Sequence, residues 1–210
     1  MHPDPIDIGN KWPCCVIASP RSGSSAFAYD LAVRHNLGYS SCILEPNLAF
    51  KDQSHSMHAV DSKIAAHDYL FIVKFMIHEA HQHQTYRQLL SMPSYKIRLY
   101  RRNKIKQIAS KYISEVMQKS FFAAGEEYEP YECQINLELI DHTIQEMTHI
   151  DLLLRDSQIQ FDETIAYEDL WQLDTSWAVK TTQPENLEDI YAAVRDRLSV
   201  QGIAMEFSII

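Results

Sequence analysis

The sequence is poor in residues that break up a fold, and it lacks long apolar runs. Only five of its 210 residues are Gly and eight are Pro, which argues against a low-complexity or collagen-like chain. No apolar run reaches the roughly 18 residues needed to cross a membrane. Residues 1–12 carry no apolar core of a signal peptide. These observations predict a soluble, cytoplasmic protein with no membrane span.

Cysteine and basic residues are also scarce. The four Cys residues show no C-x-x-C spacing, so free thiols in a reducing compartment are the simplest expectation. Lys and Arg number 19 against 28 Asp and Glu, a formal net charge of −9. A protein with this balance lacks the basic surface typical of nucleic-acid binding. Any anion site must therefore come from a local cluster of Arg and Lys side chains.

The most informative stretch is Cys14–Gly38. Its first five residues are apolar and predict a buried strand, Cys14–Ala18, and its end, Asn36–Gly38, is typical of a helix terminus. The loop between strand and helix is rich in small polar residues. A strand, such a loop and a helix place backbone N–H groups around a phosphate. Four of its side chains are candidate phosphate contacts, as is the backbone of its glycine: Arg21, Ser22, Gly23, Ser24 and Ser25.

This loop differs from the phosphate loop of kinases. That motif, G-x-x-x-x-G-K-[ST], carries a Lys that reaches the β- and γ-phosphates. Here Gly23 is followed by Ser24 and Ser25, and the basic residue precedes the glycine. The difference argues against ATP-dependent phosphoryl transfer with Mg²⁺. A serine-rich turn that merely caps a helix is the plain alternative.

Strands and helices are predicted to alternate along the rest of the chain. Further strands are expected at Cys42–Leu44, Tyr69–Val73, Tyr95–Tyr100 and Gln160–Ala166, and helices at Ser56–Ala66, Ile77–Leu90, Lys104–Lys119, Ile135–Arg155 and Leu187–Val200. This alternation predicts one α/β domain over residues 1–210, with three layers, a central mostly parallel sheet and a surface arm at residues 1–12. Ligands bind at the carboxyl ends of such strands, where the Arg21 loop, Glu45, Lys74 and Arg102 are expected to meet.

A second phosphate contact is predicted at the end of the third long strand. Arg102 leaves this strand, and Ser110 follows eight residues later, about two helical turns along. Together they could hold one phosphate through a charge-assisted hydrogen bond and a hydroxyl. The alternative is a solvated basic turn ahead of an ordinary amphipathic helix.

Three motifs, taken together, resemble the sulfotransferases that use 3′-phosphoadenosine-5′-phosphosulfate (PAPS). They are Pro20–Ser25, the R-N…S-x-Y pattern from Arg102 to Tyr112, and Tyr167–Leu170, and they occur in the family's order. The chain is similar to the compact bacterial and carbohydrate-type branch. The resemblance implies a P-loop-like nucleotide-binding scaffold and sulfuryl transfer to a hydroxyl or amine. It places Arg21 through Ser25 on the 5′-phosphosulfate, Arg102 and Ser110 on the 3′-phosphate, and Tyr167 beside the adenine.

The chain departs from the family in two places. Ala26 stands where cytosolic members have a Trp that stacks on adenine. The family's late R-K-G loop is missing, and Lys180 is the candidate to replace it. A kinase-like phosphoryl transferase and a non-catalytic nucleotide-binding or interaction domain therefore remain alternatives.

Sulfuryl transfer needs a base that takes the proton of the acceptor. Glu45 is the first candidate, because compact members resemble this chain with a Glu-Pro after the first helix; a surface carboxylate is the alternative reading. His78 is the second candidate, near the place of a Lys-Thr-His in many cytosolic members. The spacing of His78, Glu79, His81 and His83 is not H-E-x-x-H, so no metal is expected. The expected partners are PAPS as co-substrate and a small-molecule or carbohydrate acceptor; a homodimer is left open.

Overall fold

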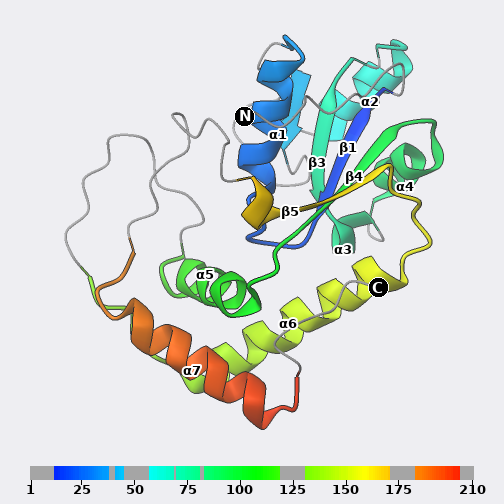
Figure 1. Cartoon of the computed structure of the whole chain (residues 1–210). Helices are drawn as coiled ribbons and strands as arrows, with labels where there is room; N and C mark the ends of the chain where they lie inside the picture. The colour runs from blue at the N-terminus through cyan, green and yellow to red at the C-terminus, as the bar shows by residue number, and fades with distance from the viewer. Residues whose placement is uncertain are drawn as a thin grey trace.

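The protein is built around a five-stranded parallel sheet. The computed structural model describes residues 12–37, 41–44, 57–68, 70–80, 83–118, 131–170 and 183–203. The strands lie in the order β2-β3-β1-β4-β5, and every pairing is parallel (Figure 1). Their bounds are β1 Cys14–Ala18, β2 Cys42–Leu44, β3 Ile72–Met76, β4 Tyr95–Tyr100 and β5 Glu163–Ala166. The prediction of an α/β fold with a parallel sheet is confirmed.

Seven helices and a short 3-10 turn connect or cover these strands in the part of the chain that the structure describes. The helices are α1 Ser24–Arg34, α2 Met57–Ala65, α3 Ile77–Ala80, α4 Gln84–Ser91, α5 Lys104–Val116, α6 Leu137–Asp156 and α7 Leu187–Val200, and the turn is η3 Tyr167–Asp169. None of the helices within these described ranges is long and apolar enough to cross a membrane.

Helices cover both faces of the sheet. All five residues of β1 are buried, as expected for the central strand of a covered parallel sheet. On one face, Phe27 and Leu31 of α1 pack against alternate strand residues. On the other face, α2, α4 and the C-terminal half of α6 contribute to a second core that contains Tyr86 and Ile150. The result is a three-layer arrangement, consistent with the prediction.

A third core lies among α5, α6 and α7, which are grouped below the sheet in Figure 1. Tyr112 of α5 is buried in this core, and its hydroxyl accepts a hydrogen bond from the Asn136 backbone N–H at 2.8 Å. Asn136 in turn caps α6 by accepting from the Leu139 N–H at 3.1 Å. Tyr112, the last residue of the second motif, therefore has a structural position between two helices.

Two predictions of secondary structure were wrong. The helix predicted at Ile77–Leu90 is two helices, because His83 adopts an extended backbone (φ −117°, ψ 129°) and starts α4 anew. The strand predicted at Tyr69–Val73 is Ile72–Met76. Its pairing with β1 aligns Lys74 with Val16 in the middle of the strand, so Lys74 does not mark the strand's end. The predicted arm falls almost wholly on residues 1–11, which lie outside the described residues.

The connections that leave the neighbouring strands β1 and β4 run toward opposite edges of the sheet. After β1 the chain continues to β2 on one side of the sheet, and after β4 it continues to β5 on the other side. Neighbouring strands whose connections diverge in this way form the switch point at which α/β sheets bind ligands. The switch point is therefore the expected position of a binding site.

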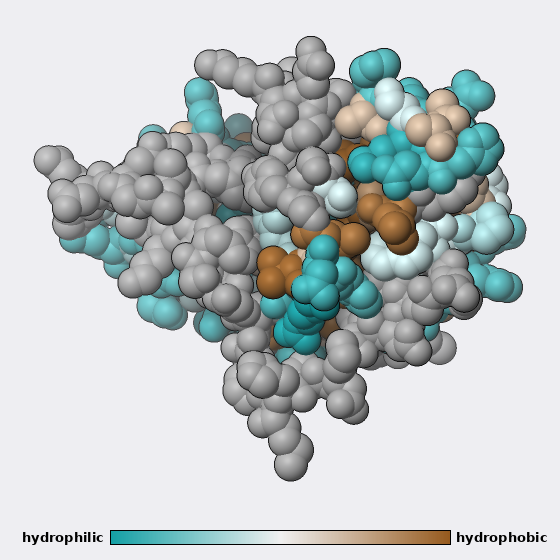
Figure 2. Space-filling view, turned by 90° about the horizontal axis from the view of Figure 1, so that it is seen from above, coloured by the Kyte–Doolittle hydropathy of each residue, from teal (hydrophilic) through white to brown (hydrophobic). Residues whose placement is uncertain are grey.

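Figure 2 shows the molecule from above, and hydrophobic side chains gather in the middle of this face among hydrophilic ones.

The four cysteines, Cys14, Cys15, Cys42 and Cys133, are buried and free. Burial raises the pKa of the Cys15 thiol to about 12, so this thiol stays protonated and unreactive at neutral pH. The expectation of free thiols is confirmed.

Candidate functional site

The loop between β1 and α1 is held in an unusual backbone conformation. Arg21 and Gly23 both have positive φ values, 59° and 74°. Ser22 is buried and its Oγ donates to the Ser19 carbonyl oxygen at 2.8 Å. Gly23 precedes Ser24, the first residue of α1, which is also buried. The loop is therefore tightly fixed, and it ends at a helix N-terminus, where backbone N–H groups and the helix dipole favour an anion.

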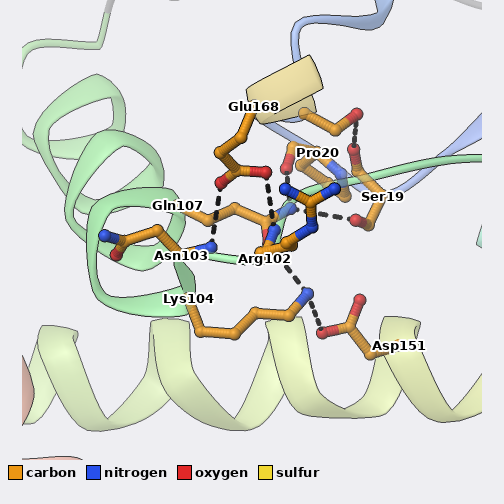
Figure 3. Close-up of polar contacts among 9 residues, drawn as sticks. Ser19, Pro20, Arg102, Asn103, Lys104, Gln107, Asp151 and Glu168 are labelled. Atoms are coloured by element: carbon orange, nitrogen blue, oxygen red, sulfur yellow. Dashed lines mark hydrogen bonds and ion pairs between the residues drawn. The ribbon is translucent and has the colours of Figure 1, made fainter. Parts of the chain in front are cut away.

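A chain of polar contacts from α6 through α5 supports this loop (Figure 3). Asp151 of α6 pairs with the Lys104 Nζ at 2.7 Å, and Lys104 donates to the Gln107 Oε1 at 2.9 Å. Gln107 is fully buried and donates to the Ser19 Oγ at 2.9 Å and to the Pro20 carbonyl oxygen at 2.7 Å. The Lys104 ammonium is paired with both the carboxylate and the amide oxygen, and the amide nitrogen bonds the loop, so the network fixes the loop without leaving the buried charge unpaired.

Arg21 joins the first motif to the second. Its Nε donates to the Ser110 Oγ at 2.9 Å, although the two residues are 89 apart in the sequence. Burial lowers the pKa of the Arg21 guanidinium, and the neighbouring charge of Arg101 lowers it further. Two guanidinium groups thus lie close together at the switch point, an arrangement that an anion between or beside them would stabilise.

Arg101 and Tyr167 complete the arrangement. The Arg101 guanidinium carbon lies 4.8 Å from the centroid of the Tyr167 ring, and Nη1 donates to the Arg21 carbonyl oxygen at 3.3 Å. The Arg101 Nε is buried without a hydrogen-bond partner among the described residues. The Tyr167 ring lies so close to Gly23 that a Cβ on the glycine would overlap it. Segments from all three motifs therefore contact one another.

Arg102 and Ser110, which the sequence assigns to one phosphate, have different partners. Ser110 accepts from Arg21, whereas the half-exposed Arg102 guanidinium forms an ion pair with Asp169. The backbone N–H groups of Arg102 and Asn103 donate to the Glu168 carboxylate at 3.0 and 2.9 Å (Figure 3). A shared role of Arg102 and Ser110 on a 3′-phosphate stays a prediction.

Lys74 is a second buried basic residue, and the charge of Arg21 acts on it. It is 1% exposed and lies on the same strand face as Ile72 and Met76, which pack in the core that includes α1. Burial lowers the pKa of the Lys74 ammonium to about 7; Glu79 opposes this shift and the Arg21 charge adds to it. Lys74 is therefore a cation whose charge can change near neutral pH.

His78, the second candidate base, lies on α3 at the carboxyl end of β3 and is half-buried. Burial lowers the pKa of its imidazole, and the charges that act on it include Glu146 and His149 of α6 and Lys111 of α5. Its Nδ1 is buried without a hydrogen-bond partner in the described part of the chain. Glu45, the first candidate base, and Lys180 lie outside the described residues. No three His, Cys, Asp or Glu side chains gather as metal ligands within the described ranges.

Sequence reasoning missed four residues of this arrangement: Arg101, Gln107, Glu168 and Asp169. Arg101 is adjacent to Arg102 in the sequence, and only the fold shows that Arg101 contacts the loop while Arg102 pairs with Asp169. Gln107 lies one turn before Ser110 on α5, the spacing of a shared helix face, and this could have drawn attention to it. Glu168 and Asp169 directly follow Tyr167 in the sequence, and their negative charges are complementary to the positive charges of Arg101 and Arg102.

Replacing Gly23 tests how tightly this arrangement is built. Gly23→Ala is expected to lower the free energy of unfolding by about 2–3 kcal/mol, because a Cβ adds backbone strain and an overlap with the Tyr167 ring. Gly202→Ala is the matched control: its φ is 64° and a Cβ would meet nothing within 4 Å. It should cost only the strain, about 1 kcal/mol. Equal losses in urea denaturation would contradict the close contact between Tyr167 and Gly23.

No family model matches the sequence, and neither a curated protein nor a solved structure matches it. Its function is therefore inferred from the motifs and from the geometry of the site.

Proposed function

We propose that the chain is a sulfotransferase that moves a sulfuryl group from PAPS to a hydroxyl or amine acceptor. The observation that carries the proposal is the meeting of three sequence motifs at the switch point of the sheet: the Arg21 loop, the Arg102–Tyr112 segment and the Tyr167–Leu170 segment. The Arg21–Ser110 contact joins residues 89 apart in the sequence, and the Asn103–Glu168 contact joins residues 65 apart. A turn that only capped α1 would not need the other two.

The proposed roles follow from the chemistry of each group. Arg21 and the backbone N–H groups of Ser22–Ser25 bind the 5′-phosphosulfate at the start of α1, where they neutralise charge on the transferring group and the departing phosphate. Ser110 and Arg102 bind the 3′-phosphate, and Tyr167 contacts the adenine. Lys180 is proposed as a further phosphate contact from its sequence position. The strand order, with this loop after the central strand, supports a P-loop-like scaffold.

The reaction exchanges one sulfur–oxygen bond for another, or for a sulfur–nitrogen bond. The acceptor attacks the sulfur, its proton passes to a base, and the bond from sulfur to the 5′-phosphate oxygen breaks. The base is Glu45 in this proposal, with His78 as the alternative. The electron pair of the broken bond stays on the phosphate, next to the guanidinium of Arg21.

Ligand-induced stabilisation tests the proposal. Adenosine 3′,5′-bisphosphate is expected to raise the melting temperature without Mg²⁺, because the loop has no metal-linked phosphate lysine. At a hundredfold excess over Kd, the stabilisation amounts to about 2.7 kcal/mol. ATP and ATP with Mg²⁺ are the comparison ligands. Stabilisation by ATP with Mg²⁺ alone would overturn the proposal in favour of a phosphoryl transferase.

Turnover separates the enzyme from a binding domain. PAPS with a panel of sugar, phenol and amine acceptors is expected to yield adenosine bisphosphate only when an acceptor is present. Binding of the bisphosphate with no turnover on any acceptor class would favour a non-catalytic nucleotide-binding domain.

We infer a cytoplasmic site of action, where the four free thiols would stay reduced.

A further inference from the structure

The start of α5 already holds an anionic group of the chain itself. The Glu168 carboxylate accepts the backbone N–H groups of Arg102 and Asn103, at 3.0 and 2.9 Å, through its two separate oxygens. Asp169 forms an ion pair with the Arg102 guanidinium. Both acids belong to η3, the three-residue turn that follows β5. Figure 3 shows the Glu168 carboxylate directed at the two N–H groups.

The Glu168 contact has the geometry of a bound anion. Burial alone would raise the pKa of the Glu168 carboxyl, but the N–H groups of Asn103 and Arg102 and the nearby charge of Arg101 hold it below its usual value. The carboxylate is therefore ionised at neutral pH, with one oxygen on each N–H. Two oxygens of a phosphate could make the same two hydrogen bonds, with a third oxygen left for a guanidinium.

The Asp169 contact is weaker. The Arg102 and Asp169 side chains are 53% and 55% exposed, and ion pairs this exposed contribute little to stability. A ligand that replaced both acids would therefore give up mainly the two hydrogen bonds of Glu168. A phosphate dianion carries more charge and more acceptor oxygens than a carboxylate, so it can compensate for that loss.

The same turn also covers the first motif. Tyr167, the residue before Glu168, lies against Gly23 at the start of α1. Its ring is held there partly by the Arg101 guanidinium. Movement of η3 away from α5 would carry Tyr167 with it, because the two residues are adjacent in one short turn. The three residues of η3 thus link the loop at Gly23 to the Arg102–Asn103 turn, the two predicted phosphate positions.

We propose that η3 is an internal ligand of the Arg102–Asn103 turn: Glu168 and Asp169 compete with the phosphate that binds there, and their displacement moves Tyr167 off Gly23. The proposal rests on the proposed function in taking that phosphate to be the 3′-phosphate of the nucleotide. It predicts that a nucleotide with phosphates at both ends opens the site better than one with a single phosphate.

Glu168→Gln tests the competition. The neutral amide offers one acceptor oxygen instead of a charged pair, so the ligand-free protein should melt at a lower temperature. The affinity for adenosine 3′,5′-bisphosphate should nevertheless rise about tenfold, because less internal contact has to be broken. Isothermal titration calorimetry measures the affinity, and adenosine 5′-monophosphate should show little gain. Asp169→Asn should give a smaller gain in affinity for the bisphosphate. Because this variant keeps the Glu168 contacts, it tests the competition even if Glu168→Gln fails to fold.

Glu163→Gln is the matched control. It makes the same change of charge at the first residue of β5, where the carboxylate accepts from the Tyr95 hydroxyl at 2.9 Å. It should leave the affinity unchanged. If folded Glu168→Gln binds the bisphosphate no more tightly than the natural chain, Glu168 is only a cap of α5 and the proposal is wrong. An equal gain for the 5′-monophosphate would likewise overturn it, because the competing phosphate would not be the 3′-phosphate.

A failure of the proposed function gives a different pattern. If neither protein binds the bisphosphate, the sulfotransferase proposal fails, and inorganic pyrophosphate becomes the probe of the turn. Tighter pyrophosphate binding by Glu168→Gln than by Glu163→Gln would still support the competition. No difference between the two variants would overturn it.

Discussion

The free energy of unfolding is expected to rise as the pH increases above neutrality. Lys74→Met is expected to abolish this rise. Burial lowers the pKa of the Lys74 ammonium from 10.5 to about 7 in the folded protein. Between these two pH values the unfolded chain holds a proton on Lys74 that the folded chain has released. Stability increases with pH wherever the unfolded state binds more protons. The expected slope is about 1.4 kcal/mol per pH unit, or up to about 5 kcal/mol over the window.

The difference between the natural chain and Lys74→Met is the quantity to measure. Burial raises the pKa of the Cys14 and Cys15 thiols, so their contribution to stability is complete below the ordinary thiol pKa and is lost as the pH rises. This opposite trend is common to both proteins and cancels in the difference. Below pH 7 Lys74 is protonated in both states, the cost of burying its charge is fully present, and Lys74→Met should be the more stable protein.

Urea denaturation at several pH values from 6 to 9 provides the measurement, because each curve gives the midpoint and the slope from which the free energy of unfolding is obtained. If the two proteins show parallel pH dependence, Lys74 keeps its charge in the folded state and the ammonium is compensated by its surroundings. The same titration with adenosine bisphosphate present would show whether a bound anion returns the proton to Lys74, since an anion favours the charged form.

Much of the fold could be predicted from the sequence. The bounds of β1, β2, β4 and α7 agree with the prediction to the residue. Each of these strands is a short, mostly apolar run, and Pro13 or Pro93 lies just before β1 or β4. Such local signals survive folding because they depend on neighbours in the chain.

The register of β3 could not be predicted, because a charged residue stands in a strand buried on both faces. Lys74 looks like the end of a strand when only its neighbours are known. The structure extends the strand to Met76, since pairing with β1 places Lys74 opposite Val16. A tertiary contact, and not a local preference, decides this boundary.

The site was predictable residue by residue but not as a set of contacts. Arg21, Ser110 and Tyr167 each belong to a separate motif, and the fold brings them into one cluster. The pairing of Glu168 and Asp169 with the start of α5 had no counterpart in the sequence argument. Acids after a strand favour the start of a helix on local grounds, so their partners 65 to 67 residues away stayed hidden.

The choice of catalytic base gives the largest expected effect on activity. Glu45→Gln is expected to lower turnover about 10²–10⁴-fold, the usual result of removing a general base, and to leave the affinity for adenosine bisphosphate near normal. The amide keeps the shape of the side chain and removes the oxygen that accepts the proton. The assignment comes from the sequence, in which Glu45 directly follows β2.

His78→Asn is the comparison, and it should reduce turnover less. Charges from α5 and α6 act on the His78 imidazole, and burial lowers its pKa. A neutral imidazole could accept a proton, so the geometry leaves His78 chemically competent. The ion pair between Lys111 and Glu146, at 3.4 Å, links α5 and α6, the two helices that carry these charges. Sulfate-transfer rates at saturating PAPS decide between the two residues. If His78→Asn abolishes turnover while Glu45→Gln stays within a few-fold of the natural chain, the base is the histidine at the end of β3.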